Sequence, residues 1–119
     1  MYTVSPKIER FEDIIAWQKA KGLTALVYQQ FKDCRDFAFR DQIQRAAVSV
    51  MNNIAEGYER QGDKEFKRFL YIAKGSCGEV RSMLDLALEL DYVSADDFTS
   101  SHKLCLEASK LLSGFIKTL

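Results

Sequence analysis

Apolar side chains recur every three or four residues along most of the chain, which is the spacing of one face of an α-helix. Four segments carry this pattern, at about residues 9–31, 37–59, 63–90 and 94–119. The second segment is the clearest, and its apolar stripe consists of Ile43, Ala46, Ala47, Val50, Ile54 and Tyr58. The residue pairs that mark tight β-hairpins, such as Asn-Gly and Asp-Gly, are absent. The pattern therefore predicts four amphipathic helices.

Short polar connections separate the four segments and carry helix start and stop signals. Gly62 gives the backbone freedom for a turn, and Asp63 is expected to cap the helix that follows. Ser94 to Asp97 resembles a capping box with Asp in the usual place of Glu. Because short connections make consecutive helices antiparallel neighbours, we expect an all-α, up-down-up-down four-helix bundle. A tail over residues 1–8 and one domain over 9–119 follow from this interpretation.

Composition agrees with one soluble domain, since the 119 residues are 47% hydrophobic and 29% charged. No apolar run approaches the ~20 residues that span a bilayer, and the N-terminus lacks the apolar segment of a signal peptide. The three cysteines, Cys34, Cys77 and Cys105, show no metal-ligand spacing and are odd in number. We therefore expect free thiols, a cytoplasmic location and no membrane association.

The net charge of zero hides a polarity along the chain. Residues 1–81 contain 14 basic and 11 acidic side chains, whereas residues 82–119 contain 3 basic and 6 acidic ones. The neutral total excludes the indiscriminate nucleic-acid binding of a strongly basic protein. It leaves room for a localised basic surface.

The basic half of the third helix is the strongest candidate for such a surface. Its cations are Lys64, Lys67, Arg68, Lys74 and Arg81. Tyr71 shares one side of the helix with several of them, and a tyrosine among lysines can stack on a base while ammonium groups meet phosphates. The order of charges also opposes the helix dipole. The alternative is an ordinary lysine-rich surface with one tyrosine.

The second helix carries a polar strip opposite its apolar stripe, made of Arg45, Ser49, Asn52, Glu56 and Arg60, with Asn53 beside it. One interpretation is a solvated face, the default for a bundle helix. The other is a polar seam in which the two arginines reach carboxylates or phosphates. Glu56 and Glu79 are the acids nearest the apolar strips, and we expect a buried Arg–Glu pair rather than a general acid.

The middle of the third helix contains Gly75 and Gly78, each of which costs ~1 kcal/mol relative to alanine. Gly75 lies opposite the core stripe, which suggests that another backbone approaches there. A second apolar strip flanks the first and consists of Ile72, Met83, Leu86 and Leu90. The strip predicts a subunit interface; the alternative is that this helix is central in the bundle.

Catalytic signatures are missing. The single histidine, His102, is expected on an exposed turn and has no glutamate three residues before it, so no di-iron motif is present. The sequence also lacks a phosphate-binding loop, a dinucleotide fingerprint and a nucleophile elbow. We expect no enzyme activity, no cofactor and no metal.

Helices two and three contain motifs that resemble a known family: Gln42 to Val50, Asn53-Ile54-Ala55-Glu56-Gly57, Arg60, Lys64 to Leu70, Ala73 to Ser76, and Glu79. The family is the four-helix-bundle family of proteins encoded in intervening sequences of 23S ribosomal RNA genes. The chain departs from it where members often have a proline, before the second helix and at Met51-Asn52.

The resemblance implies a ring of copies, with a homopentamer favoured. It also implies kinship with the accessory variability determinant of diversity-generating retroelements, a pentameric barrel whose basic surface binds nucleic acid and a reverse transcriptase. The family-motif positions expected to form a structural seam are Ser49, Asn53, Glu56, Gly57, Gly75, Ser76 and Glu79.

Two functions remain open from the sequence. The first is a non-enzymatic, oligomeric accessory protein that binds nucleic acid, structured RNA before DNA. Its candidate contact residues are Arg45, Arg60, Lys64, Lys67, Arg68, Tyr71, Lys74 and Arg81. The second is a scaffold for a partner protein, in which the arginine strip serves only subunit assembly.

Overall fold

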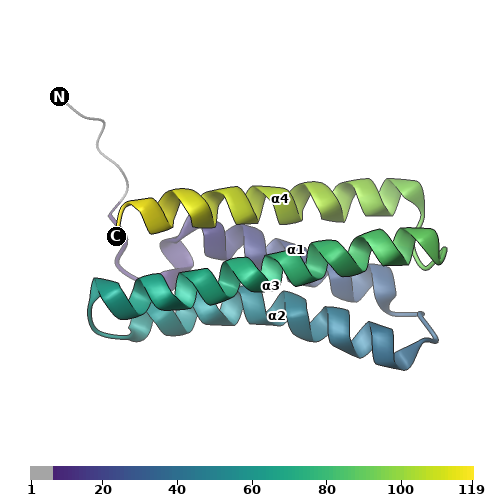
Figure 1. Ribbon diagram of the computed structural model, residues 1–119, viewed down its shortest axis with the longest axis horizontal. Helices are drawn as coiled ribbons and strands as arrows, with labels where there is room; N and C mark the ends of the chain where they lie inside the picture. Colours follow the sequence, from purple (N-terminus) through teal and green to yellow (C-terminus); the bar gives the residue numbers. More distant parts are fainter. Residues whose placement is uncertain (1–6) are drawn as a thin grey trace.

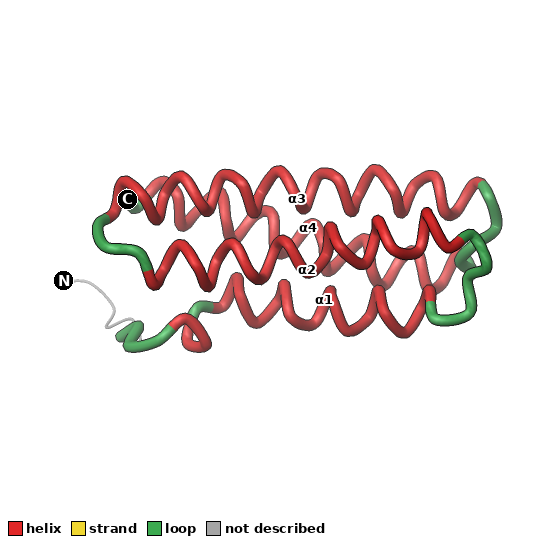
Figure 2. The backbone as a smooth tube through the Cα atoms, turned by 90° about the horizontal axis from the view of Figure 1, so that it is seen from below, coloured by secondary structure: helices red, strands yellow, loops and turns green. Residues whose placement is uncertain are grey.

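A computed structural model describes residues 7–119, in which four long helices run antiparallel to one another (Figure 1). A short 3-10 helix, η1 (Phe11–Asp13), precedes α1 (Ile15–Phe31), α2 (Phe37–Glu59), α3 (Asp63–Glu89) and α4 (Ala95–Lys117). Consecutive helices pack side by side and α4 closes the bundle against α1, so the diagonal pairs lie further apart (Figure 2). The molecule measures 49 × 27 × 19 Å. The predicted four-helix bundle is confirmed.

The core lies on the bundle axis and draws on every long helix. Its largest fully buried side chains include Leu23 of α1, Ile43 of α2, Leu70 and Leu84 of α3, and Leu112 of α4. Each comes from the apolar stripe that the helical period picks out. Burial of these stripes, rather than intrinsic helix propensity, supplies most of the stability of such helices.

The first helix begins later than the sequence pattern predicts. The predicted start at Glu9 is wrong, because Ile14 adopts an extended conformation (φ −76°, ψ 119°) and α1 begins at the next residue. Ile14 nevertheless fills the core with 1% exposure, and Phe11 packs edge-on against Trp17 with ring centroids 5.2 Å apart. Apolar side chains on both sides of this break maintained a helical spacing, so the period did not reveal it.

A carboxylate stabilises this N-terminal turn. Asp13 accepts a hydrogen bond from the backbone N–H of Glu9 at 3.1 Å and another from Nε of Arg10 at 3.4 Å. These bonds, the Glu9 N–H foremost, lower the pKa of the Asp13 carboxyl below its ordinary value.

The remaining helix ends follow local capping chemistry, with one difference from the prediction. Asp36 accepts a bond from the Phe39 N–H at 3.1 Å to cap α2, and Ser94 accepts one from the Asp97 N–H at 3.1 Å to cap α4. The cap of α3 is Gly62 rather than Asp63, because the turn needs a positive φ of 95° that glycine adopts without strain. Asp63 becomes the first helical residue, where the helix dipole favours a carboxylate.

The connection between α3 and α4 is fastened to the connection between α1 and α2. Asp91 takes a positive φ of 60° to end α3, and the following N–H of Tyr92 donates to Ala87 O at 2.8 Å. The Tyr92 hydroxyl then donates to Oδ2 of Asp36 at 2.8 Å. One carboxylate therefore both caps α2 and holds the neighbouring loop.

Candidate nucleic-acid interface

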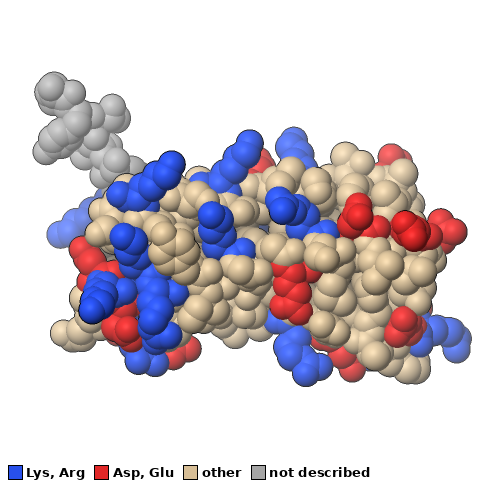
Figure 3. Space-filling model, in the orientation of Figure 1, with Lys and Arg blue, Asp and Glu red and all other residues tan. Residues whose placement is uncertain are grey.

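The predicted basic side of α3 lies on the molecular surface. We call Lys64, Lys67, Tyr71, Lys74 and Arg81 the α3 basic face. Tyr71 is 56% exposed, Lys67 is half-buried, and the other three are exposed. In Figure 3, Lys and Arg gather over the N-terminal part of α3 and Asp and Glu over its far end. Lys67 and Arg81 are fourteen positions apart, which corresponds to ~21 Å along the helix.

The other two predicted contact residues of this region are engaged by carboxylates. Arg68 donates to both carboxylate oxygens of Glu65, at 3.1 and 3.3 Å. Arg60 donates to Glu56 at 2.8 Å and approaches Glu65 to 3.9 Å. The Arg68 hydrogen bond lowers the pKa of Glu65, and the same bond raises the pKa of Arg68. A phosphate binding at Arg60 or Arg68 would have to replace these partners.

The Arg60–Glu56 pair also corrects the expectation of a buried ion pair. Its side chains are 47% and 55% exposed, so solvent screens the attraction between them. The pair spans one helical turn at the C-terminal end of α2, where the chain leaves the bundle. The prediction of burial was wrong because the strip opposite Ile54 faces solvent at this end.

Both arginines also pack on the ring of Phe69, a residue that the sequence pattern assigned only to the core. The guanidinium carbons of Arg60 and Arg68 lie 5.0 and 4.7 Å from the ring centroid of Phe69. Phe69 is only 7% exposed, so the two cations cover it. Such cation–π contacts contribute ~0.5–1 kcal/mol at exposed sites. Nothing in the sequence indicates these contacts, because Arg60 reaches Phe69 from outside α3.

The cations of the α3 basic face, in contrast, carry no ion pair. Across residues 7–119, no carboxylate lies within 4.0 Å of the charged groups of Lys64, Lys67, Lys74 or Arg81. Their charges are consequently available to an external anion. This row of unpaired cations beside an exposed tyrosine is the main feature of the candidate interface.

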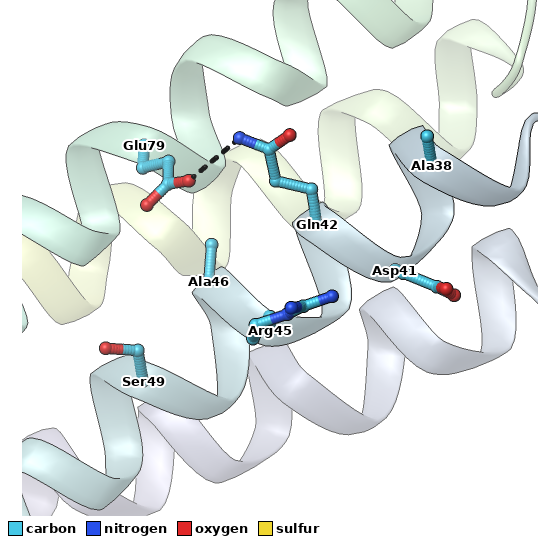
Figure 4. Close-up of a pocket in the computed structure, with 7 residues that line it drawn as sticks. All are labelled: Ala38, Asp41, Gln42, Arg45, Ala46, Ser49 and Glu79. Atoms are coloured by element: carbon cyan, nitrogen blue, oxygen red, sulfur yellow. Dashed lines mark hydrogen bonds between the residues drawn. The ribbon is translucent and has the colours of Figure 1, made fainter.

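Arg45 lies apart from this face, at a polar groove between α2 and α3. The groove has a volume of about 540 Å³ and is lined by Ala38, Asp41, Gln42, Arg45, Ala46, Ser49 and Glu79. Gln42 donates to Glu79 at 3.4 Å, whereas Arg45 extends along α2 toward Asp41 and away from Glu79 (Figure 4). Glu79, one of the two acids offered as the partner of an arginine, is therefore bonded to Gln42 instead.

Three of the family-motif residues do form a seam between α2 and α3. The hydroxyls of Ser49 and Ser76 are hydrogen-bonded at 2.9 Å. Asn53 donates from Nδ2 to the carbonyl oxygen and the hydroxyl of Ser49, at 2.8 and 3.0 Å. This part of the polar strip holds the two helices together, and it is not a solvated face.

Gly57 permits a close approach of α2 and α3. A Cβ atom at this position would lie 2.5 Å from Cβ of Phe69 and 3.1 Å from Cδ1 of Phe66. Real Cβ contacts do not reach the first of these distances, so the helix spacing here depends on glycine. Glu56, Gly75 and Glu79 are exposed, and of these Glu79 still contacts α2 by accepting the hydrogen bond from Gln42.

The second apolar strip of α3 is uncovered by the chain itself. Ile72, Leu86 and Leu90 are 41%, 47% and 45% exposed, and Met83 is half-buried. A Cβ added at Gly75 would meet nothing within 4 Å. The alternative that α3 is central in the bundle is therefore excluded, and the strip remains free for a partner.

Other classes of site find little support in the part of the chain that is described. Within residues 7–119, no helix is long and apolar enough to cross a membrane, and no group of three His, Cys, Asp or Glu side chains could hold a metal ion. His102 stacks on Phe98 with ring centroids 4.9 Å apart and is half-buried, so the expectation of an exposed histidine was wrong.

Comparison with known proteins identifies the family. No curated protein matches the chain. Among solved structures, a protein of unknown function from the S23 ribosomal protein family of Bacteroides thetaiotaomicron VPI-5482 has a similar fold, with a TM-score of 0.82 at 24% sequence identity. The match covers 86% of this chain and 98% of that one. The sequence model of the 23S rRNA-intervening sequence protein family matches residues 12–114, and the chain belongs to this family.

Proposed function

We propose that this protein is a non-enzymatic accessory factor that binds nucleic acid, structured RNA before DNA, as a ring of identical subunits. The observation that carries the proposal is the row of unpaired cations on the α3 basic face. Arg60 and Arg68 add to this row near the start of α3 when a phosphate replaces their carboxylate partners. Arg45 is a separate contact at the groove between α2 and α3. A homopentamer is the assembly we favour, in keeping with the family resemblance.

The charge distribution supports phosphate binding along a line. Four cations of the face lie on one helix without competing carboxylates, and the acidic residues of α3, Asp85 and Glu89, follow beyond Arg81. If all four contact phosphates of single-stranded RNA, the logarithm of affinity falls with the logarithm of salt with a slope of about −3 per subunit. Repetition around a ring multiplies this modest contact.

Tyr71 is the reason to favour structured RNA over duplex DNA. Its ring is exposed between Lys67 and Lys74, and base stacking on an aromatic side chain contributes ~1–3 kcal/mol. Stacking requires an unpaired base, which loops and bulges of structured RNA provide. A uniform duplex offers phosphates but no base for this ring.

The test is RNA binding measured across a salt series. We expect the double substitution Lys67→Glu and Lys74→Glu to weaken binding at least tenfold and to flatten the salt dependence. Lys21→Glu with Lys32→Glu makes the same charge change at two exposed lysines, one in α1 and one directly after it, and is expected to preserve most of the affinity. Flat salt dependence of the wild type, or equal loss in both variants, would refute phosphate binding by this face.

Tyr71→Ala separates stacking from charge. We expect it to reduce binding to an RNA hairpin with an open loop about tenfold, while binding to duplex DNA changes little. Equal effects on both ligands would show that the tyrosine does not read unpaired bases.

Subunit assembly has its own test. The exposed strip of Ile72, Leu86 and Leu90 is the surface we assign to the subunit contact. Leu86→Glu is expected to lower the mass of the assembly in native mass spectrometry, and Leu111→Glu, at a 36% exposed site on α4, serves as the control. If Arg45→Ala changes the assembly but not RNA binding per subunit, the arginine belongs to assembly alone.

The second candidate function is a scaffold for a partner protein, and the same apolar strip is what favours it. If a partner rather than a second copy covers Ile72, Leu86 and Leu90, the purified chain is a monomer. A partner captured in a pull-down that survives nuclease treatment and is lost with Leu86→Glu would then support the scaffold over the nucleic-acid factor.

A further inference from the structure

A small pocket between α3 and α4 contains two thiols beneath two cations. Its volume is about 240 Å³, and the lining includes Cys77 and Cys105 with Lys74, Arg81 and Ser109. Both thiols are 1% exposed, so the pocket provides their route to small solutes. A water molecule needs only ~10–15 Å³ of such a cavity, which leaves room for a peroxide.

Cys77 of α3 and Cys105 of α4 meet across the helix interface and line the same pocket. Sγ of Cys105 donates to the carbonyl oxygen of Cys77 at 3.2 Å. The pKa of Cys105 is lowered and that of Cys77 is raised, and for each thiol the other is the largest cause. The pair is therefore asymmetric, with one sulfur suited to ionise and the other to keep its proton.

Positive charge at the pocket favours the ionised form of Cys105. Arg81 acts on both thiols in the direction that lowers their pKa, and neither Arg81 nor Lys74 has a carboxylate within 4.0 Å among residues 7–119. Reactive cysteines are found in electropositive surroundings of this kind, and redox-sensitive ones often lie next to a second cysteine.

We infer that Cys105 and Cys77 form an oxidisable dithiol for hydrogen peroxide or a similar small hydroperoxide, with Cys105 as the attacking sulfur. The Cys105 thiolate attacks one peroxide oxygen, the O–O bond breaks, and the departing hydroxide takes up a proton to leave as water. Cys105 becomes a sulfenic acid, oxidised by two electrons. The Cys77 thiol then attacks the Cys105 sulfur, a disulfide forms, and its proton leaves with the hydroxyl as a second water.

This inference does not rest on nucleic-acid binding. The disulfide would link α3 to α4 near the middle of the bundle, directly below Lys74 and Arg81. The third cysteine, Cys34, is half-buried in the connection between α1 and α2, where its Sγ lies 3.8 Å from Asp36 O. It does not line the pocket and serves as an internal reference for ordinary thiol reactivity.

The experiment treats the folded full-length protein with hydrogen peroxide and maps the cysteine-containing peptides by mass spectrometry. We expect an intramolecular Cys77–Cys105 disulfide, recognised by the loss of two hydrogen atoms, to form before Cys34 is oxidised. With Cys77→Ser, dimedone should trap a sulfenic acid at Cys105. With Cys105→Ser, Cys77 should stay reduced under the same conditions.

A second series tests the role of the pocket. Arg81→Gln should slow disulfide formation, and Lys32→Gln, a lysine at the end of α1, should leave it unchanged. In urea, where the fold is lost, the three cysteines should react at similar rates. Because peptide mapping of the unsubstituted protein identifies the reacting cysteines, the inference remains testable even if a serine variant does not fold.

Four results would overturn the inference. Oxidation of Cys34 ahead of the pair, preservation of both thiols in the folded protein while urea exposes them, or oxidation of Cys77 ahead of Cys105 would each show that the pocket does not activate Cys105. Disulfides only between subunits would exclude Cys77 as the resolving thiol.

Discussion

Replacing Gly57 by alanine tests whether the spacing of α2 and α3 depends on that glycine. The new Cβ would lie 2.5 Å from Cβ of Phe69 and 3.3 Å from its Cγ. Carbon atoms in favourable contact are ~3.5–4.0 Å apart, so the helices would have to separate by about 1 Å. Because Cβ of Phe69 is fixed to its backbone, a change of rotamer cannot relieve the overlap.

Two opposing effects set the magnitude. Alanine in place of glycine favours a helix by up to ~1 kcal/mol, while overpacking a well-packed interior costs ~1–3 kcal/mol. We therefore expect Gly57→Ala to lower the free energy of unfolding by ~1–2 kcal/mol. Gly114→Ala is the matched control, since Gly114 also lies near the C-terminal end of its helix but has nothing within 4 Å of its added Cβ. It should stabilise the protein by ~0.5–1 kcal/mol.

Urea denaturation followed by circular dichroism measures both variants at one protein concentration. The expected difference of ~1.5–3 kcal/mol corresponds to a clear separation of the two midpoints, one below and one above the wild type. If Gly57→Ala stabilises the protein as much as Gly114→Ala, the close helix contact at Phe69 is not required and the reasoning fails.

The polar contacts at the helix ends make further predictions. Asp36→Ala removes the cap of α2 and the acceptor of the Tyr92 hydroxyl, so it should lower the unfolding free energy by ~1–2 kcal/mol; Asp33→Ala should change it little, as urea midpoints will show. The pKa of Glu65 is lowered by its bond to Arg68, so this carboxylate stabilises the fold above its unfolded pKa, and that contribution is lost as the pH falls through its folded pKa. In an NMR pH titration, Arg68→Gln should raise the pKa of Glu65, and an unchanged value would contradict the pairing. The hydrogen bond to Asp36 raises the pKa of Tyr92. The stabilisation from this bond is therefore present below the unfolded pKa of the phenol and is lost as the pH rises through the folded pKa. Asp36→Ala should abolish the rise in the Tyr92 pKa, which an absorbance titration of the phenol measures.

The helix pattern was readable from the sequence because helix formation is largely local. The α2 range of 37–59 agrees with the structure at both ends. The side chain of Asp36 caps the start of the helix, and Gly62, which has no side chain, permits the turn that follows its end. The start of α1 was misplaced because the extended residue Ile14 sits in the core without changing the spacing of apolar residues around it.

The candidate interface was only partly readable. The unpaired cations of α3 share one helix face, and their spacing alone placed them together. The sequence offered Glu56 as a partner of Arg60 but placed the pair in the interior, whereas both side chains are exposed. It also allowed Arg45 a carboxylate partner, and none lies within 4.0 Å of it among residues 7–119. Burial and ion pairing depend on rotamers and on residues of another helix, which the sequence pattern does not contain. The contacts of Arg60 and Arg68 with the ring of Phe69 were not predicted either, for the same reason.

By itself, the sequence determined that four amphipathic helices form, where most of them end, and that positive charge accumulates on the first part of α3. Periodicity and capping depend on residues that are close together in the chain, so the sequence alone is enough to predict them. Only the tertiary structure decided which polar residues bond across helices, as Ser49 does with Ser76, why Gly57 must lack a side chain, and which apolar residues stay uncovered. It also brought Cys77 and Cys105 together in one pocket, because contacts between residues 28 positions apart depend on how the helices are packed.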